Sequence, residues 1–229
     1  MKRIRIFGDS ILKGVVYTQS SNQYSVLENS PMVQLSQTYG LDIHNNSVFG
    51  CTVGKGFQLL KRSIERGLSC DAALVEYGGN DCDHPWATIA ENPKGEFSPN
   101  TPLEIFSTTM QNMLETLKAR KIKPVLMTLP PIDSLRYLNH ICRNGLNKDA
   151  ILSWLQGDVQ GIARFQELYS LKINEIAKAT GTILVDVRSA FLQRRDYGSL
   201  ICEDGIHPNR EGYRLIASSF ADYLDRQSS

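Results

Sequence analysis

Strand-like and helix-like segments alternate along the whole chain, and this alternation constrains the fold more than any other feature. The β-rich segments are residues 2–7, 41–48, 71–77, 123–129 and 182–187, and the helical segments are residues 34–39, 57–67, 102–120, 162–180 and 209–226. Strands separated by helices predict a parallel sheet with helices on both faces. Because crossovers between parallel strands are right-handed, we expect an α/β fold, a three-layer α/β/α sandwich with a five-stranded parallel sheet. Flavodoxin-like and response-regulator-like domains have the same alternation.

Several helix ends carry capping signals. Thr101 precedes Glu104 by three residues, and Pro102 stands between them at the first turn, which predicts a capping box. Gly67 and Gly181 each follow an amphipathic run, where a glycine readily adopts the left-handed conformation that ends a helix. We therefore expect helices that begin after Thr101 and end at these two glycines.

The composition favours one large domain over residues 1–229. Hydrophobic residues make up 41% of the 229 residues and charged residues 21%, which is ordinary for a globular protein. A chain of this size buries roughly 70% of its unfolded surface, enough for a core without disulfides. The net charge of +1 gives no electrostatic reason to expect a nucleic-acid partner.

The ends and the cysteines indicate the expected compartment. The N-terminal apolar run is broken by Arg5 and ends at Gly8, too short for the core of a signal peptide, and no run reaches the ~18 apolar residues of a membrane span. The five cysteines are odd in number and form no Cys-x-x-Cys pair, so we expect reduced thiols and no zinc site. These features predict a cytoplasmic protein without a membrane span.

Two segments interrupt the alternation. Residues 82–101 are rich in proline and contain Trp86, and residues 130–161 mix charged with apolar side chains. Loops this long in a compact domain are usually functional, and both begin at the carboxyl end of a predicted strand, where open α/β sheets bind ligands. We therefore interpret both segments as lid-like insertions.

Ser10 is the candidate nucleophile. It ends the Gly-Asp-Ser sequence of residues 8–10, directly after the first predicted strand, and Gly8 allows the backbone to turn sharply there. The Ser10 hydroxyl would then point to the carboxyl edge of the sheet. The alternative is an ordinary turn in which Asp9 and Ser10 bond local N–H groups.

Asn80 is a candidate hydrogen-bond donor. It lies in the Gly-Gly-Asn-Asp sequence of residues 78–81, after the third predicted strand, which in such folds usually lies beside the first. Its side-chain amide could donate to an oxyanion near Ser10, while Asp81 could anchor the turn through backbone N–H groups. The alternative is again a turn, because Gly-Gly and Asn-Asp are common turn sequences.

Asp204 and His207 form the sharpest signal. They lie three residues apart, before Pro208 and the last helix, so the carboxylate can fold back onto Nδ1 of the imidazole. Nε2 then stays free for a serine, which is the geometry of a catalytic dyad. The alternative is a capping aspartate beside an incidental histidine. The other histidines are His44, His84 and His140, of which only His84 has neighbouring carboxylates, within the first insertion.

Gly50 is a candidate second donor. Residues 46–50 end the second predicted strand, and a glycine there lets its backbone N–H approach a bound oxygen closely. Gly54 is the alternative for this role. The glycines after Thr52 lack Walker spacing, which argues against nucleotide binding.

These four blocks, in this order, resemble those of the SGNH (GDSL) hydrolase superfamily, whose blocks centre on Ser, Gly, Asn and His. They are residues 8–11, 46–50, 78–81 and 204–207, and the continuation through Pro208, Asn209, Gly212 and Tyr213 is also similar. The resemblance implies a flavodoxin-like, five-stranded parallel sheet between helices. One departure is Ile11 in place of a frequent leucine, and the larger one is the length of the two insertions.

The resemblance implies a serine esterase that needs neither a metal nor an organic cofactor. Ser10, His207 and Asp204 would form the triad, and the N–H groups of Ser10 and Gly50 with the Asn80 side chain would form the oxyanion hole. The expected partner is a small-molecule ester, with carbohydrate or other small esters favoured. The alternatives are a lysophospholipase or thioesterase activity, or a non-catalytic ligand-binding module on the same fold. The sequence does not indicate the oligomeric state.

Overall fold

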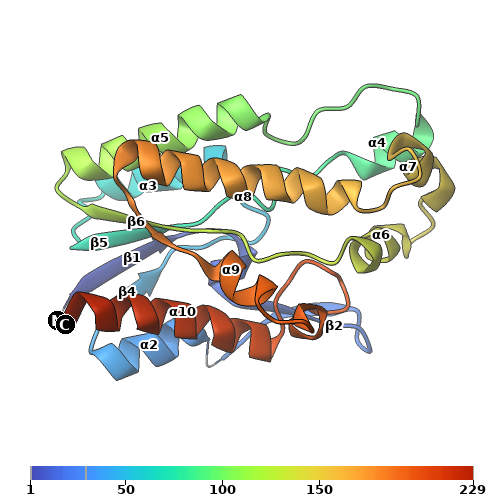
Figure 1. The fold of residues 1–229 in the computed structure, drawn as a ribbon. Coiled ribbons are helices and arrows are strands. Elements are labelled where there is room, and N and C mark those ends of the chain that lie inside the picture. The colour runs from blue at the N-terminus through green and yellow to red at the C-terminus, as the bar shows by residue number, and fades with distance from the viewer. Residues whose placement is uncertain (1, 29, 229) are drawn as a thin grey trace.

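The computed structural model describes residues 2–28 and 30–228, which contain a parallel sheet at the centre of three layers (Figure 1). The strands are β1 (Arg3–Phe7), β4 (Asp42–Asn45), β5 (Ala72–Val75), β6 (Lys123–Met127) and β7 (Ile183–Val185), in the order β4-β1-β5-β6-β7. All four pairings are parallel. The predicted five-stranded α/β sandwich is therefore confirmed, as is the expectation that the third predicted strand lies beside the first.

Helices cover both faces of the sheet (Figure 1). One face carries α3 (Val53–Glu65), α5 (Leu103–Ala119) and α8 (Gly161–Thr180), and the other carries α2 (Pro31–Tyr39), α9 (Val187–Leu192) and α10 (Arg210–Ser228). Each face has its own cluster of buried apolar side chains. Among the described residues, no helix is long and apolar enough to cross a membrane.

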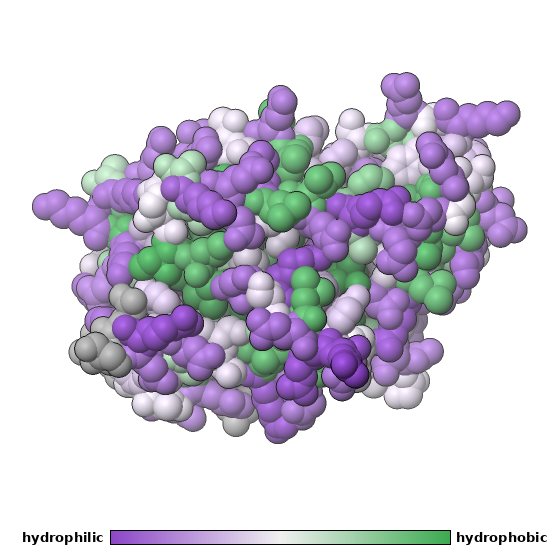
Figure 2. Space-filling view, viewed as in Figure 1, coloured by the Kyte–Doolittle hydropathy of each residue, from purple (hydrophilic) through white to green (hydrophobic). Residues whose placement is uncertain are grey.

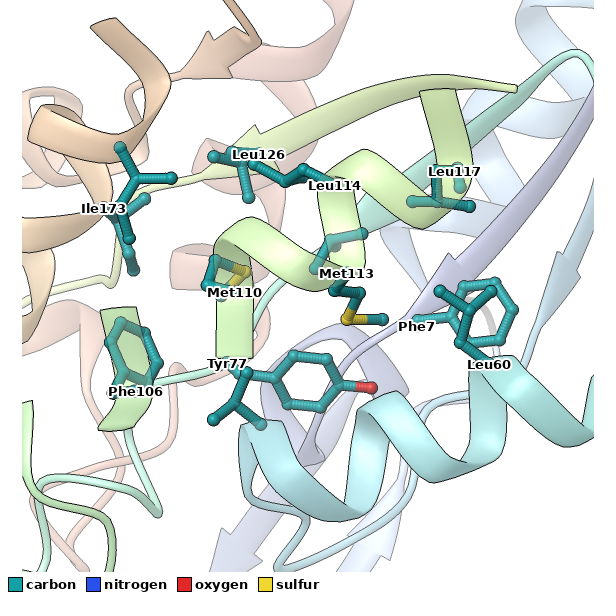
Figure 3. Close-up of a cluster of buried hydrophobic side chains, with 14 of the residues drawn as sticks. Phe7, Leu60, Tyr77, Phe106, Met110, Met113, Leu114, Leu117, Leu126 and Ile173 are labelled. Carbon is teal, nitrogen blue, oxygen red and sulfur yellow. The ribbon is translucent and has the colours of Figure 1, made fainter. Parts of the chain in front are cut away.

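The α5 helix shows how the sequence pattern builds the core. Met110, Met113 and Leu117 recur at helical spacing, and all three are completely buried against the sheet and α3 (Figure 3). Each such side chain contributes about 1.5–3 kcal/mol when removed from water. On α3, a Cβ at Gly56 would lie 2.1 Å from the Tyr77 ring, so only glycine lets this helix pack so closely.

The outer surface contrasts with these cores. The face in Figure 2 is dominated by hydrophilic side chains, with smaller apolar areas between them. Leu168 and Leu171 of α8 and Leu192 of α9 are exposed. All five cysteines are free thiols, and four of them are buried.

The capping predictions had mixed outcomes. Gly181 adopts the left-handed conformation at the end of α8, and Gly67 has a φ of 82° just after α3, as expected. The capping box at Thr101 is wrong, because Pro102 holds the N-cap position and no side chain caps α5. The Thr101 N–H instead donates to the Asp81 carbonyl at 3.0 Å, which ties this residue to the turn after β5.

The two insertions contain helices that pack on each other. Residues 82–101 include α4 (Trp86–Glu91), and residues 130–161 include α6 (Ser134–Cys142) and α7 (Lys148–Trp154). These helices lie beyond the carboxyl ends of the strands (Figure 1). A third apolar cluster joins them, formed by Trp86, Ile89, Tyr137, Leu138, Ile151, Leu155 and Ile162. We call this joint structure the helical cap.

One hairpin was not expected from the sequence. The chain leaves β1 through a single helical turn, α1 (Ser10–Lys13), and then forms an antiparallel pair of β2 (Val15–Thr18) and β3 (Gln23–Val26). The strands are only four residues long, and all of β3 is exposed, so no strong hydrophobic alternation marks them. The hairpin follows the candidate nucleophile directly.

Candidate active site

The four sequence blocks meet at the carboxyl edge of the sheet. Ser10 follows β1, residues 46–50 follow β4 and residues 78–81 follow β5, and these three strands are neighbours. Residues 204–207 reach the same edge in the segment before α10. Because parallel strands end together, blocks that are far apart in the sequence become adjacent.

Ser10 is held at the first position of α1. Asp9 caps this turn, since its Oδ1 accepts the N–H of Ile11 at 2.8 Å. Gly14, with a φ of 84°, ends the helix after one turn. The Ser10 side chain is therefore fixed in direction, and the residue is only 7% exposed.

A continuous chain of hydrogen bonds joins Ser10, His207 and Asp204. His207 Nε2 lies 2.9 Å from Ser10 Oγ, and His207 Nδ1 lies 2.5 Å from Asp204 Oδ2. Asp204 Oδ1 also accepts the backbone N–H groups of Ile206 and His207, each at 3.2 Å. The carboxylate thus fixes the orientation of the imidazole and directs Nε2 to the serine.

The environment keeps Asp204 ionised. Burial would raise its pKa, but hydrogen bonds and charge from His207 outweigh burial and hold the pKa of Asp204 below its ordinary value of 3.8.

The turn of residues 204–207 depends on Gly205, whose φ is 81° and where a Cβ would lie 2.4 Å from the Tyr137 backbone nitrogen. The turn therefore packs directly against α6 of the helical cap.

Aromatic side chains cover the imidazole. The Phe49 ring stacks on His207 with 6.1 Å between centroids, and the Tyr24 ring meets His207 edge-on at 5.3 Å. Tyr24 Oη also lies 2.9 Å from His140 Nε2, which links the β2–β3 hairpin to α6. Neither Tyr24 nor His140 was predicted to belong to the site. No local signal could have done so, because the two are 116 residues apart.

Asn80 lies between the first two blocks. Its Nδ2 donates to Asp9 Oδ2 at 2.9 Å and, more weakly, to the Cys51 carbonyl oxygen at 3.4 Å. In both contacts the NH2 group of the side chain is the donor. The neighbouring Asp81 accepts the Val53 N–H with both oxygens, at 3.0 and 3.1 Å, and so ties the turn to the start of α3. Burial raises the pKa of Asp81 to about 6.

Gly50 has sequence neighbours on both sides that contact the site. It stands between Phe49, which stacks on the imidazole, and Cys51, whose carbonyl contacts Asn80 Nδ2. Its φ of 67° is a conformation that favours glycine. Gly54, the alternative, is exposed in the first turn of α3.

His84 lies apart from the serine. It packs against the rings of Trp154 and Phe165, at 5.3 and 4.4 Å between centroids. Burial lowers its pKa to about 4, so His84 is neutral at ordinary pH. Its carboxylate neighbours are engaged elsewhere, since Asp83 accepts the Trp86 indole N–H at 2.6 Å.

A cavity of about 80 Å³ opens beside Ser10. Ser10, Asn80 and His207 line one side of it. The other walls come from the helical cap and α8, and they include Trp86, Ile132, Tyr137, Ile162, Phe165 and Gln166. A reactive serine, an imidazole and a donor amide thus share one small, mostly apolar cavity. Within residues 2–28 and 30–228, no cluster of three His, Cys, Asp or Glu side chains could hold a metal ion.

Comparison with known proteins agrees with this arrangement. A sequence profile of the GDSL-like Lipase/Acylhydrolase family matches residues 6–215. The chain is 22% identical over 219 residues to the GDSL esterase/lipase WDL1 of Oryza sativa subsp. japonica, which covers 92% of this chain and 76% of that protein. The chain therefore belongs to the GDSL-like lipase/acylhydrolase family, and it is a hydrolase of ester bonds.

Solved structures share the fold at low sequence identity. The lipase/acylhydrolase from Enterococcus faecalis superimposes with a TM-score of 0.67 at 17% identity, covering 99% of this chain and 97% of that one. The esterase EstA from Pseudoalteromonas sp. gives 0.62 at 18% identity, with 99% and 98% covered. A catalytic mutant of the acetylxylan esterase Axe2 from Geobacillus stearothermophilus gives 0.62 at 18% identity, with 96% and 93% covered.

Proposed function

We propose that this protein is a serine esterase in which Ser10, His207 and Asp204 form the catalytic triad. The observation that carries the proposal is the unbroken hydrogen-bond chain from Ser10 Oγ through both nitrogens of His207 to Asp204. All three side chains are buried, and Ser10 and His207 line the same cavity. Such a chain serves to activate a serine hydroxyl at neutral pH.

The proposed reaction has two halves. His207 Nε2 takes the proton of Ser10 as Oγ attacks the ester carbonyl carbon, and the protonated His207 then gives that proton to the departing alcohol. A water molecule, deprotonated by His207, attacks the acyl-enzyme and releases the carboxylic acid and free Ser10. Asp204 remains ionised throughout and stabilises the imidazolium, in keeping with its lowered pKa.

The oxyanion of each tetrahedral intermediate would be held by three donors. These are the backbone N–H groups of Ser10 and Gly50 and the side-chain amide of Asn80. Asn80 Nδ2 donates strongly to Asp9 at 2.9 Å and only weakly to the Cys51 carbonyl at 3.4 Å. We expect the oxyanion to replace the weaker bond, so that Asp9 keeps the amide in place during the reaction.

The favoured substrates are small esters, including acetylated carbohydrates. The cavity at Ser10 measures about 80 Å³, and Trp86, Ile162 and Phe165 line it on the side away from the triad. A short acyl group suits this space better than a long chain. One structural neighbour is an acetylxylan esterase, whereas others carry lipase names, so lysophospholipase or thioesterase activity remains the alternative.

We also propose that residues 1–229 form one domain and that residues 82–101 and 130–161 shape this cavity as lid-like insertions.

The first experiment compares wild type with Ser10→Ala on p-nitrophenyl esters of increasing acyl length. We expect Ser10→Ala to lose nearly all turnover and all labelling by a fluorophosphonate probe, while wild type prefers acetate. Ser219→Ala is the matched control, because its hydroxyl donates to the Leu215 carbonyl of its own helix. Turnover by Ser10→Ala at the wild-type rate would disprove the mechanism. A wild type that is not labelled would favour the non-catalytic module, and a preference for long chains would favour the lipolytic alternative.

A further inference from the structure

A pair of buried carboxyl groups, apart from the Asp204–His207 pair, also lies at Ser10. Asp9 and Glu76 are each 1% exposed. They come from adjacent strand ends, since the Glu76 N–H donates to the Phe7 carbonyl at 3.0 Å. The Asp9 N–H donates to Glu76 Oε2 at 3.3 Å, which holds the two carboxyl groups close together. Both residues line the catalytic cavity.

One of the two groups must carry a proton. An ionised carboxylate has no hydrogen to donate, so the two carboxyl groups can share a hydrogen bond only if one of them is protonated. Two buried carboxylates in contact also repel each other too strongly for both to ionise. The titratable groups whose charges act on the pair include Asp81, His207, Cys51, Tyr77, Cys82 and Tyr213. Of these, only His207 can become positively charged.

The contacts assign the proton to Glu76. Asp9 accepts two further hydrogen bonds, from the Ile11 N–H and from Asn80 Nδ2, and both favour its ionised form. Glu76 Oε2 accepts the Asp9 N–H at 3.3 Å, but the buried Glu76 Oε1 has no hydrogen-bond partner among the described residues, so fewer contacts support a charge on Glu76 than on Asp9. Burial raises the pKa of Glu76 well above its ordinary value, and the nearby Asp9 raises it further.

We propose that Glu76 is a positioning residue that remains protonated and donates its hydrogen to Asp9. Asp9 in turn holds the Asn80 amide and caps the helical turn that carries Ser10. The shared proton also keeps the pair at one negative charge, beside the place where the oxyanion forms. The kinetic part of this inference rests on the proposed function, because it needs Asn80 as an oxyanion donor.

Two substitutions separate proton donation from shape. Glu76→Gln keeps a donor toward Asp9, so we expect kcat within about threefold of wild type at pH 7. Glu76→Leu keeps most of the volume but cannot donate, and we expect kcat to fall by about 10–100-fold with a smaller change in KM. The exposed Glu91→Gln is the matched control. Equal losses in Glu76→Gln and Glu76→Leu would overturn the proposal.

The pH profile gives a readout that a merely structural role would not move. In wild type, loss of the shared proton at alkaline pH adds a second negative charge beside the oxyanion, so kcat should fall. Glu76→Gln has no such proton, and this alkaline decline should disappear. An unchanged decline in Glu76→Gln would overturn the proposal.

Infrared spectroscopy of unliganded protein tests the proton directly, whether or not the esterase proposal holds. Wild type at pH 7 should show the C=O band of a protonated carboxyl group, and Glu91→Gln should keep it. Glu76→Gln should lack this band. If Glu76→Gln does not fold, the infrared spectrum of wild type is the test. Absence of the C=O band at pH 7 would then overturn the proposal.

Discussion

Two buried pairs that each contain a carboxyl group lie at the candidate nucleophile, and the partner of that carboxyl group differs between them. Asp204 and Glu76 are 0% and 1% exposed, so burial opposes the charge on both. Asp204 bonds an imidazole, and its pKa is lowered. Glu76 bonds another carboxyl group, and its pKa is raised. The partner, and not the depth of burial, therefore decides which carboxyl group is ionised.

One small site can therefore use one carboxyl group in its ionised form and another in its neutral form. On the His207 side, an ionised carboxylate stabilises the positive charge that forms when the imidazole takes a proton. On the Asn80 side, a neutral acid limits the negative charge near the oxyanion. Active sites commonly separate carboxyl groups in this way, by environments that shift their pKa values apart.

The largest expected effect is on the His207 side. Asp204→Asn preserves size but removes the charge and can favour the wrong imidazole tautomer, so we expect kcat to fall by about 10⁴-fold. Steady-state kinetics on p-nitrophenyl acetate would measure this. Asp42→Asn, an exposed residue at the start of β4, is the matched control and should leave kcat unchanged. A loss below about tenfold for Asp204→Asn would mean that the two sides do not differ as we infer.

A smaller effect is expected on the oxyanion side. Asn80→Ala removes one of three donors, which should raise the barrier by ~2.7–4 kcal/mol and lower kcat by about 10²–10³-fold. Weak activity should therefore remain, unlike in Ser10→Ala. The exposed Asn112→Ala serves as control. If Asn80→Ala changes KM alone, the amide binds substrate without stabilising the transition state, and its assigned role is wrong.

The smallest effect concerns stability, and it follows from the raised pKa of Glu76. Below the ordinary pKa of 4.5, Glu76 is protonated in both the folded and the unfolded chain. As the pH rises above this value, the unfolded chain ionises while the folded protein keeps the proton, so wild type loses stability. Glu76→Gln lacks this loss, and its stability relative to wild type should rise with pH by at most about 1.4 kcal/mol per unit.

Urea unfolding of both proteins from pH 5 to pH 8 would measure this slope. The slope is informative even if Glu76→Gln has a different stability at every pH. A packing defect changes the free energy of unfolding by the same amount at each pH and leaves its slope unchanged. The free energy of unfolding of Glu91→Gln should change with pH by the same amount as that of wild type. A difference between Glu76→Gln and wild type that does not change with pH would show that Glu76 holds no extra proton in the folded state.

Local sequence patterns predict the five strands of the parallel sheet, helices α2, α3, α5, α8 and α10, and the place of each block. Strand and helix periodicities are local, and residues 8–10, 78–81 and 204–207 lie at ends of elements that such patterns identify. Glu76 lies in the strand predicted at residues 71–77, but no local pattern identifies its partner. The parallel topology then brings the strand ends together.

Which side chains become partners depends on the packing of distant segments. Asp9 meets Glu76 across 67 residues, Tyr24 meets His140 across 116, and the Thr101 N–H donates to the Asp81 carbonyl where the local pattern favoured a helix cap. The same is true of the helical cap, in which two separate insertions share one apolar cluster. A local sequence pattern predicts the conformation of its own segment. The pKa of a buried group depends on the atoms that packing brings beside it.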